Sequence, residues 1–125
     1  MSEAGLLDDG EASRESADLL AHLSRNACVN DGTPTSGFES RSADVLAQYL
    51  GGSGLEVERF SAVDGRDSLV ARIEGTDPSA PTLLLMGHTD VVPANPDGWR
   101  RDPFGGEIID DEVWGRGAID MLNLT

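Results

Sequence analysis

The sequence predicts an α/β protein in which a layered sheet is flanked by helices. Two stretches with helical spacing of apolar residues come first in the 125-residue chain. Strand-like stretches follow, and a further helix is expected after Asp120. This order favours a layered α/β fold, because each helix or strand must bury its apolar face against another layer.

Two helices are expected in the first half of the chain. From Ser13 to Val29, leucine and alanine recur at helical spacing, and residues 1–12 before them are expected to form a disordered acidic leader. A second apolar stripe with the same spacing ends at Leu50. Ser36 followed by Glu39 is typical of a capping box, which predicts the start of this second helix.

The apolar period then changes from that of a helix to that of a strand. Residues 55–59 and 68–74 alternate between apolar and polar side chains, as half-buried strands do. Thr82–Met86 is a continuous apolar run, which is typical of a central strand buried on both faces. Residues 107–110 and 113–114 are expected to form the arms of a hairpin.

Composition excludes some classes of partner. The formal charge is −14, from 23 acidic and 9 basic residues, and all the basic residues are Arg. This charge repels phosphate backbones, so no nucleic-acid partner is expected. No apolar run approaches the roughly 18 residues that a membrane span needs. We therefore expect a cytoplasmic protein without a membrane partner; salt adaptation and a GC-rich genome both remain explanations of the acidic, lysine-free composition.

The single cysteine, Cys28, lies in an apolar stretch. We expect a buried structural thiol, because no histidine lies near it in the sequence to activate it as a nucleophile. Asn30-Asp31-Gly32 is expected to end the first helix.

The first motif that carries chemistry runs from Gly87 to Pro93, directly after the predicted buried strand. Ligands of α/β proteins gather beyond the carboxyl ends of strands. His88 and Asp90 are placed there two residues apart, and a carboxylate next to an imidazole can orient it as a metal ligand. The alternative is an ordinary loop histidine with a satisfied hydrogen bond.

The second motif runs from Trp114 to Met121. Its two glycines allow a sharp turn that leads to Asp120 at a junction between a strand and a helix, a usual place for a metal-binding acid. The alternative is that Asp120 caps the helix that follows.

Together, Gly87–Pro93, Trp99–Phe104 and Trp114–Met121 closely resemble a family of two-metal metallopeptidases and deacylases. This family comprises the zinc-dependent aminoacylases, acetylornithine deacetylases, succinyl-diaminopimelate desuccinylases and glutamate carboxypeptidases. The resemblance covers most of residues 13–125.

The resemblance implies a role for three residues. His88 matches a histidine that binds one metal, and Asp120 matches the carboxylate that bridges both metals. Asp90 matches the catalytic acid that orients the histidine. The implied cofactors are two divalent metals, zinc in the first place, with cobalt or manganese as alternatives. We therefore expect the side chains of His88 and Asp120 to converge on one point.

The resemblance also bears on neighbouring positions. Trp99, Pro103 and Phe104 match a loop near the mouth of the site, where we expect packing and not substrate contact. Arg116 is expected to tie its turn together. Leu122 departs from many relatives, which have Lys there. A cis peptide bond between Asp120 and Met121 is also implied.

The implied function is hydrolysis of amide bonds in N-acyl amino acids or small peptides by a metal-activated water, in a protein that could be a homodimer. The family's Glu-Glu pair, which supplies the general base, has no counterpart in this sequence. We therefore expect residues 13–125 to be the N-terminal portion of a metallohydrolase catalytic domain, truncated at its C-terminus and inactive alone. The alternative is a non-catalytic relative that acts as a binding or regulatory module. The substrate-binding residues are not indicated.

Overall fold

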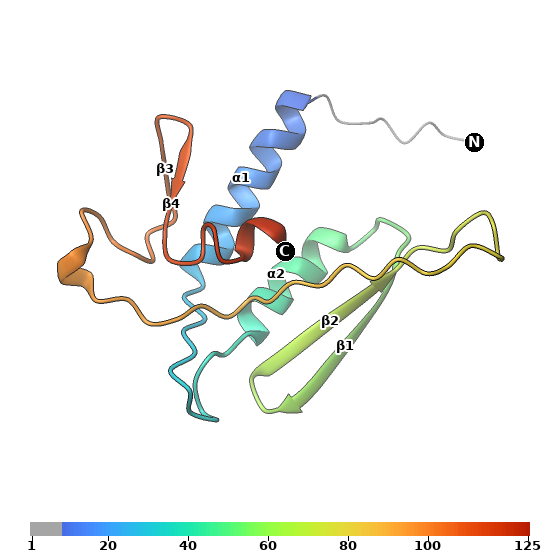
Figure 1. Ribbon diagram of the computed structural model, residues 1–125, viewed down its shortest axis with the longest axis horizontal. Coiled ribbons are helices and arrows are strands. Elements are labelled where there is room, and N and C mark those ends of the chain that lie inside the picture. The colour runs from blue at the N-terminus through green and yellow to red at the C-terminus, as the bar shows by residue number, and fades with distance from the viewer. Residues whose placement is uncertain (1–8) are drawn as a thin grey trace.

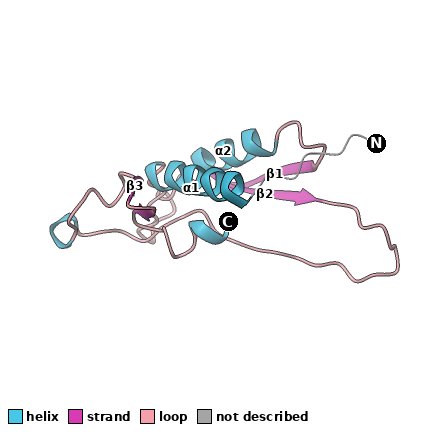
Figure 2. Cartoon of the chain, turned by 90° about the horizontal axis from the view of Figure 1, so that it is seen from above, coloured by secondary structure: helices cyan, strands magenta, loops and turns pink. Residues whose placement is uncertain are grey.

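The computed structural model describes residues 9–125 (Figure 1). Its regular elements, in chain order, are α1 (Asp9–Arg25), α2 (Ser40–Leu50), β1 (Glu56–Val63), β2 (Arg66–Arg72), β3 (Glu107–Ile109) and β4 (Glu112–Trp114), with short 3-10 turns at Pro96–Gly98 and Leu122–Leu124. A long extended segment leaves β2 and passes back across the molecule (Figure 1). Viewed from above, α1 and α2 lie on the same side of this segment (Figure 2).

Helix α1 begins four residues earlier than predicted. It includes residues 9–12, so this part of the expected disordered leader is helical; residues 1–8 lie outside the described part of the chain. Asp9 and Glu11 in the first turn favour the early start, because carboxylates stabilise the positive end of the helix dipole. The helix ends at Arg25 and not at Val29, since Ala27 adopts a left-handed backbone conformation with φ of 48°.

The predicted capping box before α2 is wrong. Ser36 Oγ donates to the carbonyl of Thr33 and accepts from the amide of Asp31, so it serves the preceding loop. Glu39 stands at the N-cap position but makes no side-chain capping bond, because its carboxylate pairs with Arg66. The helix therefore starts at Ser40, without the reciprocal bonds that the motif predicted.

The presence of both helices and strands is compatible with the predicted α/β class, but a layered sheet is not observed. Residues 9–125 contain two separate antiparallel pairs, β1 with β2 and β3 with β4. The predicted hairpin at β3 and β4 is present, and Asp110 and Asp111 turn it with φ of 49° and 63°, the left-handed values that a tight hairpin turn requires.

The central strand predicted at Thr82–Met86 is absent from the structure. These residues are extended but have no ladder partner, and the side chains of residues 83–86 are 70–82% exposed. Their apolar character suits a strand covered on both faces, but a strand forms only where a neighbouring strand accepts its hydrogen bonds. The described residues supply no such neighbour on either side.

The core joins distant parts of the chain. Leu23 of α1, Val91 and Leu122 are buried together, with Leu46 and Phe104 among the side chains packed against them. A parallel bridge links Val29 to Val91, with hydrogen bonds from the amide of Asn30 to the Val91 carbonyl and from the amide of Val91 to the Cys28 carbonyl. The segment after α1 is therefore fixed beside the residues that follow His88.

Cys28 is 1% exposed, as expected for a structural thiol, and its Sγ lies 3.3 Å from the hydroxyl of Ser42. No helix within residues 9–125 has the length and apolarity needed to cross a membrane.

Candidate metal centre

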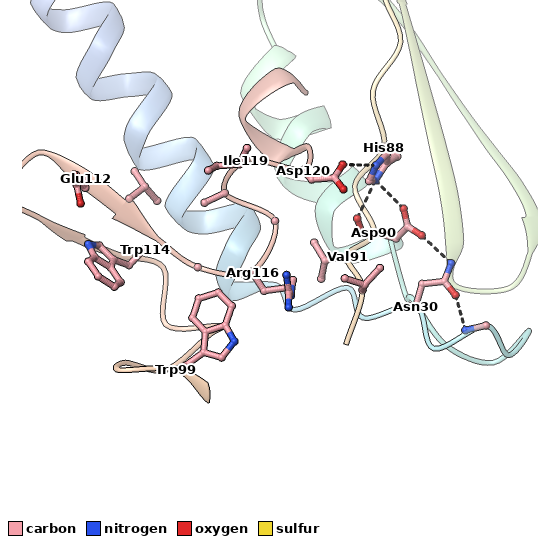
Figure 3. A pocket seen from close by; sticks show the side chains of 16 residues that line it. Asn30, His88, Asp90, Val91, Trp99, Glu112, Trp114, Arg116, Ile119 and Asp120 are labelled. Carbon is pink, nitrogen blue, oxygen red and sulfur yellow. Dashed lines mark hydrogen bonds and ion pairs between the residues drawn. The ribbon is translucent and has the colours of Figure 1, made fainter. Parts of the chain in front are cut away.

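His88 and Asp120 are brought together by the core residues next to them. His88 lies in the extended segment three residues before Val91, and Asp120 lies two residues before Leu122. The hydroxyl of Thr125 donates to the carbonyl of His88 at 3.1 Å, which adds a direct link between the two segments. Figure 3 shows the His88 and Asp120 side chains pointing toward one another.

The two side chains meet at a distance that suits a shared metal ion. His88 Nε2 lies 3.4 Å from Asp120 Oδ1. Two ligand atoms at zinc-bond lengths of about 2.0–2.2 Å and a tetrahedral angle are about 3.4 Å apart. The expected convergence is therefore present, while the role of both residues as metal ligands stays a prediction. Asp120 is 87% exposed at its side chain, so further ligands have room to approach.

Asp90 lies on the opposite side of the imidazole. Its Oδ1 is 3.0 Å from His88 Nδ1, and its own carbonyl oxygen is also 3.0 Å from that nitrogen. Both groups are acceptors, so they favour the tautomer with the proton on Nδ1. The lone pair of Nε2 then faces Asp120 and is free for a metal ion.

The structure adds three residues to which sequence reasoning gave no part in the site. Asn30 Nδ2 donates to Asp90 Oδ2 at 2.8 Å, and Arg66 Nη2 lies 4.0 Å from the same oxygen. Arg66 is held by Glu39, mainly through a 2.5 Å contact between Nη2 and Oε1. Hydrogen bonding to Glu39 raises the pKa of Arg66 above its ordinary value, with the charges of Glu39 and Asp90 adding to it against partial burial.

No local pattern in the sequence indicated these contacts. Asn30 was expected only to end a helix and Glu39 only to cap one. Each of these polar residues also suits a loop or a helix start, and its partner in the site is distant in the sequence, so the sequence alone did not reveal the contact.

Asp120 does not cap the turn that follows it. The N-cap position of the 3-10 turn is Met121, which has no side-chain capping bond, and the Asp120 carboxylate faces His88. The alternative reading of Asp120 as a helix cap is therefore wrong in this structure. The expected cis peptide bond between Asp120 and Met121 is confirmed.

A pocket of about 650 Å³ opens beside the pair and is lined by His88, Asp90, Asp120 and residues of the second motif. Arg116 lies over the ring of Trp99, 5.4 Å from its centroid (Figure 3). The backbone amide of Arg116 donates to the Pro103 carbonyl at 2.6 Å. Phe104 packs against the core. These contacts agree with the structural role expected for the four residues.

The residues present fit a metal ion in part. Within residues 9–125, no group of three or more His, Cys, Asp or Glu side chains could hold a metal, and Asp90 faces Nδ1 of the His88 imidazole instead of Nε2. Zinc usually takes four ligands. Among the described residues, His88 and Asp120 would thus supply two positions of such a shell.

An oriented imidazole thus faces a carboxylate beside an open pocket, an arrangement that is compatible with a metal ion. Comparison with known proteins indicates a family. Residues 84–124 match Peptidase family M20/M25/M40, and this stretch includes both motifs of the site. Over these residues the chain is similar to this family.

Curated relatives agree with this similarity. The chain is 50% identical to the succinyl-diaminopimelate desuccinylase of Methylobacterium nodulans, over 66% of this chain and 22% of the relative. It is 44% identical to the enzyme of the same name from Rhodopseudomonas palustris, again over 66% and 22%. The chain thus spans about a fifth of the length of the curated relatives it matches.

Proposed function

We propose that this protein takes part in metal-dependent hydrolysis of amide bonds, with His88 and Asp120 as metal ligands and Asp90 as the residue that orients His88. The observation that carries this proposal is the 3.4 Å separation of His88 Nε2 and Asp120 Oδ1. Similarity to the family over residues 84–124 supports it independently.

Each side chain has a defined task in this proposal. Bound metal ions would polarise the scissile carbonyl and lower the pKa of a water molecule. Asp90 accepts a hydrogen bond from Nδ1–H of His88, so the lone pair of Nε2 faces the pocket. Asp120 faces the same point with a carboxylate that has a second oxygen for a second ion. The sequence contains no Glu-Glu pair, so we propose that residues 1–125 by themselves do not catalyse the reaction.

The proposed substrate is a small N-acyl amino acid with a free carboxylate. Relatives at 43–52% identity carry the name succinyl-diaminopimelate desuccinylase. We therefore propose an N-succinyl amino acid as the first substrate to examine, and two zinc ions as the metals, with cobalt or manganese as alternatives.

The test is made on the natural protein that contains this sequence. Its metal content is measured by plasma mass spectrometry, and its hydrolysis of N-succinyl-diaminopimelate is compared with that of N-acetylornithine. His88→Ala and Asp120→Ala should each lose metal and reduce kcat/KM by more than about 100-fold, beyond the losses seen for residues that only orient a ligand. His22→Ala is the matched control, because His22 is the other histidine and lies exposed on α1.

Two results would count against the proposal. Full metal content in both His88→Ala and Asp120→Ala would remove these residues from the ligand set. Metal binding without hydrolysis of any N-acyl amino acid would favour the non-catalytic module instead.

A further inference from the structure

Asn30 reaches the metal centre from a distant part of the chain. The parallel bridge between Val29 and Val91 fixes the backbone, and the amide of Asn30 donates to the Val91 carbonyl at 2.8 Å. This contact sets Asn30 directly beside Asp90, although 60 residues separate them in the sequence. The placement is therefore made by backbone pairing and does not depend on the side chain itself.

Both the oxygen and the nitrogen of the Asn30 side-chain amide form hydrogen bonds. Its Oδ1 accepts from the amide of Gly32 at 3.0 Å, and its Nδ2 donates to Asp90 Oδ2 at 2.8 Å. A reversed amide would set its oxygen against the carboxylate and its NH₂ group against the amide of Gly32. The two bonds thus fix one orientation of the side chain, with the donor aimed at Asp90.

The two oxygens of Asp90 are divided between two partners. Oδ1 faces His88 Nδ1 at 3.0 Å, and Oδ2 receives the bond from Asn30. Arg66 is farther from Oδ2 of Asp90, at 4.0 Å, and it donates its hydrogen bonds to the carboxylate of Glu39. Asn30 is therefore the donor that fixes how the carboxylate is rotated, since the torsion at the end of an Asp side chain is broad.

We propose that Asn30 is a positioning residue of the metal centre: by holding Oδ2 of Asp90, it keeps Oδ1 aligned with the His88 imidazole. This inference rests on the proposed function, because it assigns Asn30 a task toward the metal ligands. Without the Asn30 donor, the Asp90 carboxylate rotates, and His88 keeps only the backbone carbonyl of Asp90 as an acceptor for Nδ1. The imidazole is then less firmly oriented, and the metal is bound more weakly.

The decisive substitution is Asn30→Asp in the natural protein. Aspartate has the same shape and keeps the acceptor for the Gly32 amide, but it removes the donor to Asp90. The added negative charge would by itself attract a cation, so weaker zinc binding would reflect the displaced Asp90 carboxylate, which has lost its donor and faces a second carboxylate. We expect the Zn²⁺ dissociation constant, measured by competition with a chromophoric chelator, to rise about 3- to 10-fold, the size of one lost hydrogen bond.

Asp31→Asn is the matched control in the same loop. The Asp31 carboxylate accepts bonds from the amide and hydroxyl of Thr33, which belong to the loop and not to the centre. This control should leave zinc affinity within about twofold of wild type, well below the loss of one hydrogen bond. Asn30→Ala is the second variant, and it should weaken zinc binding as Asn30→Asp does, with an additional loss of thermal stability.

A second readout does not depend on metal. In crystals of the metal-free Asn30→Asp protein, the Asp90 carboxylate should be rotated away from His88 Nδ1. Zinc affinity equal to wild type in Asn30→Asp, or an unmoved Asp90 carboxylate, would overturn the inference about Asn30 alone. A wild-type protein that binds no zinc would instead contradict the proposed function, and the Asp90 position would still decide the role of Asn30.

Discussion

Gly117 lies so close to Val91 that a Cβ atom on Gly117 would be 2.5 Å from Cγ1 of Val91. The second motif is thus pressed directly against the residue that follows Asp90 in the first. The same absent Cβ would also lie 2.9 Å from Cδ1 of Leu122. This close approach aligns the two segments that carry His88 and Asp120.

Gly117→Ala is expected to destabilise the protein and disturb the metal centre. Gly117 has φ of 90°, which an L side chain rarely adopts, and the new methyl group would overlap Val91. Backbone strain and overpacking together should cost about 2–4 kcal/mol, measured by urea unfolding of the natural protein. Gly98→Ala is the control, because a Cβ at Gly98 would meet nothing within 4 Å. Equal stability of the two variants would contradict the packing argument.

Asp90→Asn is expected to weaken metal binding while the fold stays intact. Asparagine can still accept a bond from the imidazole, but it lacks the negative charge that raises the basicity of His88. We expect metal affinity or kcat/KM to fall about 10- to 100-fold, with an unchanged far-UV circular dichroism spectrum. Asp97→Asn, in the loop between the motifs, is the control for loss of one charge. Unchanged kinetics and metal content in Asp90→Asn would leave Asp90 as an ordinary loop residue.

The β1–β2 hairpin should make stability depend on acid pH. Hydrogen bonds from Ser61 and Arg59 lower the pKa of Asp67 below its ordinary value of 3.8. A lowered pKa in the folded state means that Asp67 stabilises the fold above pH 3.8 and loses this contribution as pH falls through the folded pKa. Urea unfolding from about pH 5 to about pH 2 should therefore show a smaller decline in Asp67→Asn than in wild type. Parallel curves for the two proteins would exclude this contribution.

The thiol of Cys28 should be unreactive in the folded protein. It is 1% exposed and lies against the hydroxyl of Ser42 and the carbonyl of Phe38. A thiol reagent such as Ellman's reagent should modify Cys28 only as fast as the protein opens, and rapidly after denaturation in guanidinium chloride. Fast modification under native conditions would show that this region is open in solution.

Elements that depend on neighbouring residues could be predicted from the sequence. The apolar spacing of α1 and α2 indicated both helices, and the acidic turn between β3 and β4 indicated the hairpin. The ends of the helices were predicted less accurately, because the apolar stripe reports neither the charge of Asp9 in the first turn nor the left-handed backbone of Ala27 after the last turn.

Elements that depend on distant partners could not be predicted. The apolar run Thr82–Met86 suits a strand that is buried on both faces, but the run does not indicate which strands would pair with it. The bridge between Val29 and Val91 places Asn30 beside Asp90. Glu39 forms an ion pair with Arg66 instead of the predicted capping bond. The convergence of His88 and Asp120 was predictable only through the family resemblance, which supplies such long-range information.

The exposed run at residues 83–86 has a consequence for how this chain behaves in concentrated solution. Three leucines and a methionine present 70–82% of their surface to water, on a backbone with unpaired amide and carbonyl groups. Such a segment is a template for edge-to-edge pairing between molecules, which native proteins suppress with charges or covering elements. The strong negative charge of −14 opposes this association by mutual repulsion at low ionic strength. Added salt screens that repulsion, so aggregation of residues 1–125 should increase with ionic strength. The substitution Leu84→Lys should reduce this aggregation.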